Sequence, residues 1–134
     1  MKKVNYGFDA PAIMRNLCIF GLLAIIIGFL IPSFFDSSIL IYLSYLIVLV
    51  GFVLATLGIS MFVYGIKGKF NIRKLMLSKI DWEGNEMVLD IGSGTGLLMN
   101  GAAQHLTTGK AIGIDIWRSE DLSDNTLANA LANA

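Results

Sequence analysis

The chain has 134 residues, of which 55% are hydrophobic and 15% are charged, and its ten basic and ten acidic side chains cancel at pH 7. Soluble domains average about 45–50% apolar and about 25% charged residues, so this composition argues against one free-standing globular domain and against a disordered chain. Residues 17–66 contain a single charge, Asp36, whereas the rest of the chain carries the other nineteen. The lone cysteine, Cys18, excludes an internal disulfide, and no metal site is predicted. The sequence therefore predicts a membrane segment joined to a water-soluble one.

Two apolar stretches predict a pair of transmembrane helices. Residues 39–66 contain neither a charge nor a proline, and their length exceeds the roughly 20 residues that a helix needs to cross a bilayer. The first stretch, about residues 13–31, is long enough if Arg15 extends its guanidinium to the headgroups. A cleavable signal peptide is the alternative for this stretch, but no small-x-small cleavage signal follows Ile31. We therefore expect a retained two-helix hairpin.

The short connection and the basic residues define the expected topology. Pro32 is expected to stop the first helix, and Ser37 or Ser38 to cap the second. Lysines and arginines lie before the first span and after the second, whereas the connection at 32–38 has none. The positive-inside tendency then puts both termini in the cytoplasm of a two-span membrane protein.

Glycines recur seven residues apart in both predicted spans, at Gly21 and Gly28 in the first and at Gly51, Gly58 and Gly65 in the second. Each set forms a stripe along which another helix can approach closely. The stripes predict either a tight hairpin or a face for a homo-oligomer. Glycine is also simply frequent in membrane helices, so this pattern leaves the choice open.

A linker follows the second span at residues 70–85. Ile72, Leu75, Met76 and Ile80 have the spacing of one apolar helix face. The basic residues among them predict either contact with anionic lipid or an ordinary solvated face.

The most informative segment begins at Met87, where an apolar run leads into Gly92, Gly94 and Gly96. A helix is expected from the last glycine to Leu106, a second strand over Ala111–Ile116, and a second helix over Ser123–Ala134. This order, strand, glycine loop, helix, strand, is half of a nucleotide-binding layout. Glycines at such a turn permit dihedrals that other residues avoid and let a ligand approach the main chain.

The two carboxylates of this segment decide between ligands. Asp115 follows the last glycine by 19 residues, which suits an acid that accepts hydrogen bonds from ribose hydroxyls. The dinucleotide pattern G-x-G-x-x-G is not met, because Leu97 stands where the last glycine belongs. Asp90, two residues before the first glycine, would repel a pyrophosphate but suits a ligand with a cationic end.

This combination resembles motif I of the class I S-adenosylmethionine-dependent methyltransferases, and residues 113–116 resemble their ribose-binding motif. The resemblance covers roughly residues 87–134. It implies S-adenosylmethionine as cofactor, held at the positions Asp90, Gly92, Ser93, Gly94, Gly96, Asp115 and Ile116. Asp90 would lie near the methionine ammonium, directly or through water, and the three glycines would line the methionine end. Asp115 would hold the ribose hydroxyls, and Ile116 would lie against the adenine.

The expected organisation is an α/β protein in three parts. Residues 1–69 form the N-terminal segment and the membrane hairpin, 70–85 a linker helix and turn, and 86–134 an incomplete Rossmann-like β-α-β-α unit. Family members have a seven-stranded sheet, so this chain is expected to be a fragment or to obtain its missing half elsewhere, and to be too short for activity alone. No catalytic base can be named.

The predicted function is methyl transfer by a membrane-anchored enzyme facing the cytosol. The partners expected are the lipid bilayer and a small-molecule or lipid-like methyl acceptor, and no nucleic acid. The alternative is a non-catalytic two-span membrane protein whose nucleotide-binding motif is a relic or senses a ligand.

Overall fold

The computed structural model describes residues 4–134, which fall into two compact units. One unit is Ala12–Val63. The other joins Tyr64–Ala134 to the segment that ends at Pro11, which the sequence predicts to belong with the hairpin. Hydrogen bonds between the N-terminal segment and the last fifteen residues explain this grouping, as described below.

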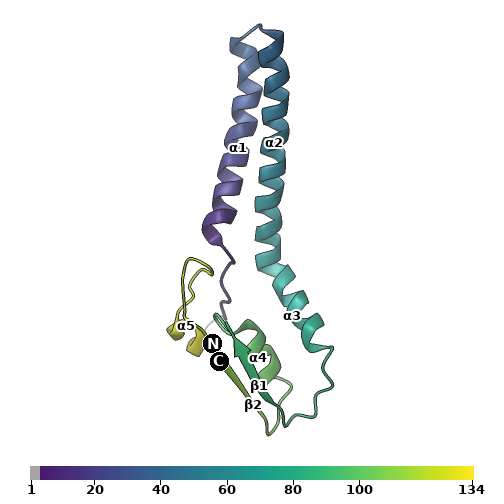
Figure 1. Cartoon of the computed structure of the whole chain (residues 1–134), viewed down its shortest axis with the longest axis vertical. Helices are drawn as coiled ribbons and strands as arrows, with labels where there is room; N and C mark the ends of the chain where they lie inside the picture. Colours follow the sequence, from purple (N-terminus) through teal and green to yellow (C-terminus); the bar gives the residue numbers. More distant parts are fainter. Residues whose placement is uncertain (1–3) are drawn as a thin grey trace. The chain divides into compact units, whose positions relative to one another are not determined.

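The first unit is a hairpin of two helices, α1 (Pro11–Phe34) and α2 (Ser38–Val63), which run side by side in opposite directions (Figure 1). Both helices are long and apolar enough to cross a membrane, as predicted. Pro32 does not stop α1, which continues to Phe34. A proline in the last turn removes only one hydrogen bond, and the N–H of Phe35 still donates to the carbonyl of Ile31 at 3.1 Å.

The glycine stripes of the two helices face each other within the hairpin. A Cβ atom on Gly21 would lie 2.6 Å from the backbone nitrogen of Ala55, and one on Gly51 would lie 2.8 Å from the carbonyl oxygen of Gly21. Gly58 approaches Cys18 in the same way, so that a Cβ there would lie 2.5 Å from the sulfur. Real Cβ atoms are not found at such distances, so these positions hold the two backbones in direct contact.

After the hairpin, the second unit resumes with a π-helical turn, η1 (Tyr64–Gly68), and continues into the short helix α3 (Lys69–Leu77). The sequence predicted a helix here but not the π turn. Gly65 provides the space for it to pack against Phe8, since a Cβ at position 65 would overlap the Phe8 ring. Wide turns of this kind occur mostly as local insertions in α-helices.

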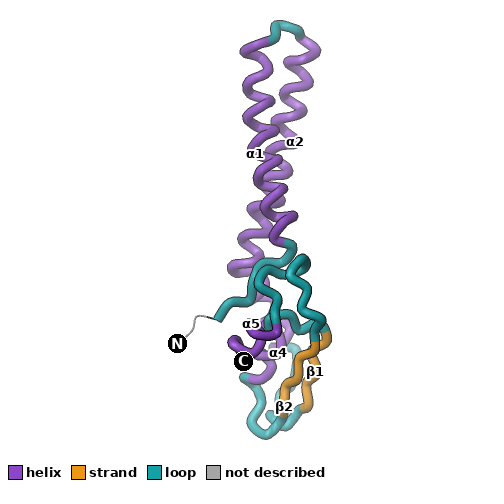
Figure 2. The backbone as a smooth tube through the Cα atoms, turned by 90° about the vertical axis from the view of Figure 1, so that its left-hand side faces the viewer, coloured by secondary structure: helices purple, strands orange, loops and turns teal. Residues whose placement is uncertain are grey.

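Two parallel strands form the sheet of this unit: β1 (Met87–Ile91) and β2 (Lys110–Ile114), the paired strands in Figure 2. The helix between them, α4 (Leu97–Ala103), is shorter than predicted and packs on both strands. The strand β2 ends before Asp115 rather than including it. The predicted succession of strand, glycine loop, helix and parallel strand is therefore present, although two strands do not by themselves define a Rossmann-like fold.

The two faces of the sheet differ. Side chains alternate between the faces along each strand, and those on the α4 side are partly buried. The opposite face is exposed and, apart from Lys110 at the start of β2, apolar. Its apolar residues are Met87, Leu89, Ile91, Ile112 and Ile114.

The chain ends in the helix α5 (Leu127–Asn133), which starts later than expected. Ser123 and Asp124 do not begin it: Asp124 has a left-handed φ of 60°, and Thr126 caps the helix by accepting the N–H of Asn129 at 3.1 Å. Ser123 instead exchanges hydrogen bonds with the backbone of Phe8, at 2.7 and 2.9 Å.

The N-terminal segment continues this pairing. Asp9 and Leu122 form an antiparallel bridge, and the N–H of Ala10 donates to the carbonyl of Asp121 at 2.8 Å. Further along, the side chain of Asn133 donates to the carbonyl of Asn5 at 2.7 Å. The two ends of the sequence are therefore neighbours in one unit.

Candidate functional site

The ends of the two strands bring Asp90 and Asp115 to the same edge of the sheet. Asp90 pairs with Gly113 in the parallel register, and Asp115 follows two residues later. The backbone N–H groups of Gly92 and Ser93 donate to the carbonyl of Ile114 at 2.8 and 3.1 Å, which ties the start of the glycine loop to the end of β2. The structure thus brings together the two carboxylates that the sequence singled out.

The loop glycines adopt the backbone conformation that requires glycine. Gly92, Gly94 and Gly96 have φ values of 76°, 55° and 90°, all in the left-handed region. Gly92 differs from the other two in its surroundings: a Cβ atom built there would have no neighbour within 4 Å. The backbone at Gly92 therefore borders open space that a ligand can occupy.

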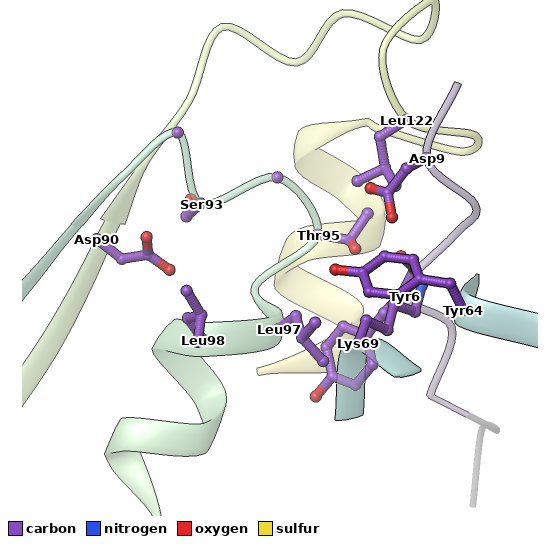
Figure 3. A pocket seen from close by; sticks show the side chains of 12 residues that line it. Tyr6, Asp9, Tyr64, Lys69, Asp90, Ser93, Thr95, Leu97, Leu98 and Leu122 are labelled. Atoms are coloured by element: carbon purple, nitrogen blue, oxygen red, sulfur yellow. Dashed lines mark hydrogen bonds between the residues drawn. The ribbon is translucent and has the colours of Figure 1, made fainter. Parts of the chain in front are cut away.

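Gly92 lies between two cavities. One, of about 350 Å³, is apolar apart from Asp115 and is lined by Ile91, Gly92, Ile114, Asp115 and Ile116. The other, of about 190 Å³, contains Asp90 and several further polar side chains, and Figure 3 shows its side chains. Its lining residues are Tyr6, Asp9, Tyr64, Lys69, Asp90, Gly92, Ser93, Gly94, Thr95, Leu97, Leu98 and Leu122. Of the predicted positions, only Gly96 lines neither cavity.

Asp90 holds the start of α4. One of its carboxylate oxygens accepts the N–H of Met99 at 3.0 Å. Burial raises the pKa of Asp90 above its ordinary value; the Met99 hydrogen bond opposes this rise, and the nearby charge of Asp115 adds to it. Asp90 is therefore a carboxylate whose negative charge is incompletely compensated, and a cation beside it would be stabilised.

Asp115 is more fully compensated. Its oxygens accept hydrogen bonds from the N–H groups of Trp117 at 2.5 Å and Gly94 at 2.8 Å, and from the side chain of Asn125 at 3.4 Å. Desolvation alone would raise its pKa, but these hydrogen bonds together lower it. The carboxylate is thus ionised and oriented, and a ribose diol would have to share it with, or replace, some of these donors.

Two buried polar atoms beside the loop lack hydrogen-bond partners among the described residues. They are the hydroxyl of Thr95, a residue only 1% exposed, and the side-chain oxygen of Asn125, a residue 5% exposed. Leaving such a group unsatisfied costs roughly 1–3 kcal/mol, so each is a place where a ligand or a water molecule would be favoured. No sequence pattern singles out either residue, although Thr95 lies inside the glycine motif.

Lys69 is another residue of the site that no sequence pattern singles out. Its ammonium group donates to the carbonyls of Tyr6, at 2.9 Å, and Gly7, and the residue is only 6% exposed. Burial lowers the pKa of Lys69, while the charge of Asp9 opposes the change. Figure 3 shows Tyr6, Asp9 and Lys69 across the cavity from Asp90.

The aromatic residues near the loop have different surroundings. Trp117 adopts a left-handed φ of 52°, and its indole N–H reaches the carbonyl of Gly94 at 3.3 Å, so it folds back over the loop. Ile116, the predicted adenine contact, is 75% exposed at the apolar cavity. Within residues 4–134 no cluster of His, Cys, Asp and Glu suits a metal ion.

No known protein family matches this sequence, and neither a curated protein nor a solved structure matches the chain. The structure defines the class of protein only coarsely. A small α/β unit with one pair of parallel strands is joined to two helices that are long and apolar enough to cross a membrane. What the unit binds has to be argued from the site itself.

Proposed function

We propose that the second unit binds S-adenosylmethionine at the glycine loop and belongs to a methyltransferase anchored in a membrane by α1 and α2. The observation that carries this proposal is the position of Gly92, which borders one cavity that contains Asp90 and another that contains Asp115. A ligand with a cationic amino-acid end and a ribose needs acceptors of this kind on either side of a close backbone approach.

The residues present fit such a ligand. Asp90, whose charge is undercompensated, would face the methionine ammonium, and the unpaired hydroxyl of Thr95 supplies a further polar contact in the same cavity. Asp115 would accept the ribose hydroxyls, and Ile116 and the other isoleucines of the apolar cavity offer a surface for the adenine ring.

When bound, S-adenosylmethionine supplies a methyl group on a positively charged sulfur, which is a good leaving group. The protein's part is then to hold the donor and the acceptor in line and to exclude water. Asp90 and Asp115 would orient the donor by binding its ammonium group and its ribose. The acceptor is proposed to be a small or lipid-like molecule, because a membrane anchor raises the local concentration of such partners.

The charge pattern supports a membrane orientation with both termini in the cytoplasm. Lys67, Lys69, Arg73 and Lys74 follow the second apolar helix, Arg15 lies in the first turns of α1, and the turn between the helices carries only Asp36. The site would then face cytosolic metabolites.

Calorimetric titration of the detergent-solubilised chain with S-adenosylmethionine tests the proposal. Binding is expected, and Asp115→Ala should weaken it by about tenfold or more, since a charged hydrogen-bond acceptor is lost. Asp90→Asn should weaken S-adenosylmethionine binding while affecting free adenosine much less. Glu120→Ala, an exposed acid five residues beyond Asp115, is the matched control and should leave affinity unchanged. Absence of heat from a folded chain would contradict the proposal.

A further inference from the structure

A third cavity, of about 510 Å³, lies away from the glycine loop between α3 and α4. Its lining residues are Phe70, Asn71, Arg73, Lys74, Leu77, Ser78, Gly101, Gln104 and His105. None of them is acidic, two carry fixed positive charge, and four more offer polar side chains. The cavity shares no residue with the two cavities at Gly92.

The spacing of these residues shows that the cavity is a groove between two helix faces. Phe70, Arg73, Lys74, Leu77 and Ser78 recur at the three- and four-residue steps of one face of α3. Gly101, Gln104 and His105 do the same along α4 and its end. The wall of α3 thus supplies Arg73 and Lys74, and the wall of α4 supplies the polar side chains of Gln104 and His105.

Arg73 is held in place by its surroundings. A Cβ atom on Gly101 would lie 2.8 Å from Cδ of Arg73 and 2.7 Å from Cδ1 of Leu77, so the glycine makes room for the arginine stem. The guanidinium carbon lies 5.7 Å from the centroid of the Phe70 ring. A guanidinium fixed in this way loses less side-chain entropy when it binds an anion.

His105 is fixed on the other wall. Its imidazole stacks on Trp82 with ring centroids 5.0 Å apart and an angle of 9° between the planes. The indole N–H of Trp82 in turn donates to the carbonyl of Leu77 at 2.9 Å, at the end of α3. The stack therefore ties the histidine wall to the arginine wall.

We propose that this groove binds a phosphate group, with Arg73 and Lys74 as its charged ligands and the side chains of His105 and Gln104 as further hydrogen-bond donors. Arginine suits phosphate because its planar fork matches two phosphate oxygens, and lysine adds a point charge. The surrounding chain favours the same ligand: residues 67–79 contain five basic residues and no acid. A phospholipid headgroup and a soluble phosphate compound share this chemistry.

The single histidine of the chain is the reporter for the test. Imidazole resonances of the full chain are followed by NMR, first in neutral detergent with pyrophosphate, then in phosphatidylcholine nanodiscs with and without phosphatidylglycerol. Pyrophosphate in detergent, or phosphatidylglycerol in the discs, is expected to shift the His105 signal in a saturable way. Arg73→Gln should weaken this response about tenfold or more, and Arg73→Lys should weaken it less because charge remains.

Lys79→Gln removes a basic residue that does not line the groove and is the matched control, for which no change is expected. If phosphatidylglycerol shifts the signal and pyrophosphate then adds nothing, the ligand is a lipid headgroup. If only pyrophosphate acts, the ligand is a soluble phosphate. A His105 signal that neither probe moves, or a response that is unchanged in Arg73→Gln and Arg73→Lys, overturns the phosphate site.

The proposed phosphate site does not depend on S-adenosylmethionine binding. Binding of a lipid headgroup at this site does rest on the proposed membrane location. Failure here with intact S-adenosylmethionine binding would remove the phosphate site alone.

Discussion

Asp90 and Asp115 show how neighbouring carboxylates acquire different properties at one edge of a sheet. Burial raises the pKa of Asp90, although the Met99 hydrogen bond opposes the rise. For Asp115, desolvation is outweighed by hydrogen bonds from Trp117, Gly94 and Asn125, which lower the pKa. The first carboxylate is therefore suited to attract a cation, and the second to accept hydrogen bonds in a fixed direction.

Asp90→Asn is expected to stabilise the unliganded chain slightly at pH 7 while weakening ligand binding. Because the pKa of Asp90 is higher in the folded than in the unfolded state, its contribution to stability falls as pH rises through the unfolded pKa. The destabilisation by the ionised Asp90 is complete above the pKa of Asp90 in the folded state and absent in acid. The gain should be at most about 1 kcal/mol, given solvent screening, and should vanish toward pH 3.

Thermal unfolding of both forms across this pH range measures the difference. A variant that is less stable than the parent at pH 7 would show instead that the charge of Asp90 is a favourable cap for α4.

The residues of the site differ in how far the sequence predicts them. Asp90, Gly92 and Asp115 follow from spacing, because a strand, a tight turn and a second parallel strand fix where their backbones lie. Lys69 and Asn125 do not, since their roles depend on contacts with Gly7 and Asp115 that local patterns do not encode. The hydroxyl of Thr95 is notable only because burial leaves it without a partner.

At the scale of elements, the hairpin is defined by backbone contact between helices. Gly51→Ala is expected to destabilise the pairing of α1 and α2 by about 1–3 kcal/mol, as overpacking does elsewhere. The new methyl group would lie 2.8 Å from the carbonyl oxygen of Gly21 and 2.9 Å from the backbone nitrogen of Ile25, neither of which a side-chain rotation can relieve.

Energy transfer between dyes at Ile19→Cys and Ile59→Cys, in a Cys18→Ala background, reports this pairing as sodium dodecyl sulfate is added to the micelles. Gly51→Ala should separate the helices at a lower fraction of this detergent than the parent. Leu22→Ala changes an exposed residue beside Gly21 and should not. Equal midpoints for all three would show that the glycine contact does not stabilise the hairpin.

Helix ends were the least predictable part of the elements. Long uncharged apolar runs predict α1 and α2, and apolar residues at four-residue steps predict α4, but this prediction extends α4 to Leu106. The capping residues Ser123 and Asp124 place the start of α5 too early. Helix α5 starts only at Leu127, after the cap Thr126, because residues before it pair with the N-terminal segment. This contact joins positions more than a hundred residues apart. Capping residues close to the helix cannot predict its start when a distant segment binds the same residues.

For the whole molecule, the proposed orientation places the turn between α1 and α2 on the outer side of the membrane. A cysteine introduced as Ser37→Cys, with Cys18→Ala, should react with a membrane-impermeant maleimide on intact cells. Cysteine at Lys79 should react only after permeabilisation. The reverse pattern would show that the basic residues after α2 do not determine the topology.

The contacts between the N-terminal segment and the residues near Ser123 constrain the order in which the chain can fold during translation. Phe8 is among the first residues to leave the ribosome, yet its hydrogen-bond partner lies 115 residues later. At about 5–20 residues per second, that partner is made roughly 6–23 s afterwards. Both apolar helices are synthesised in the interval, so the hairpin is available for membrane insertion before the second unit can close. With the membrane location proposed above, the second unit would close only after the hairpin has been inserted.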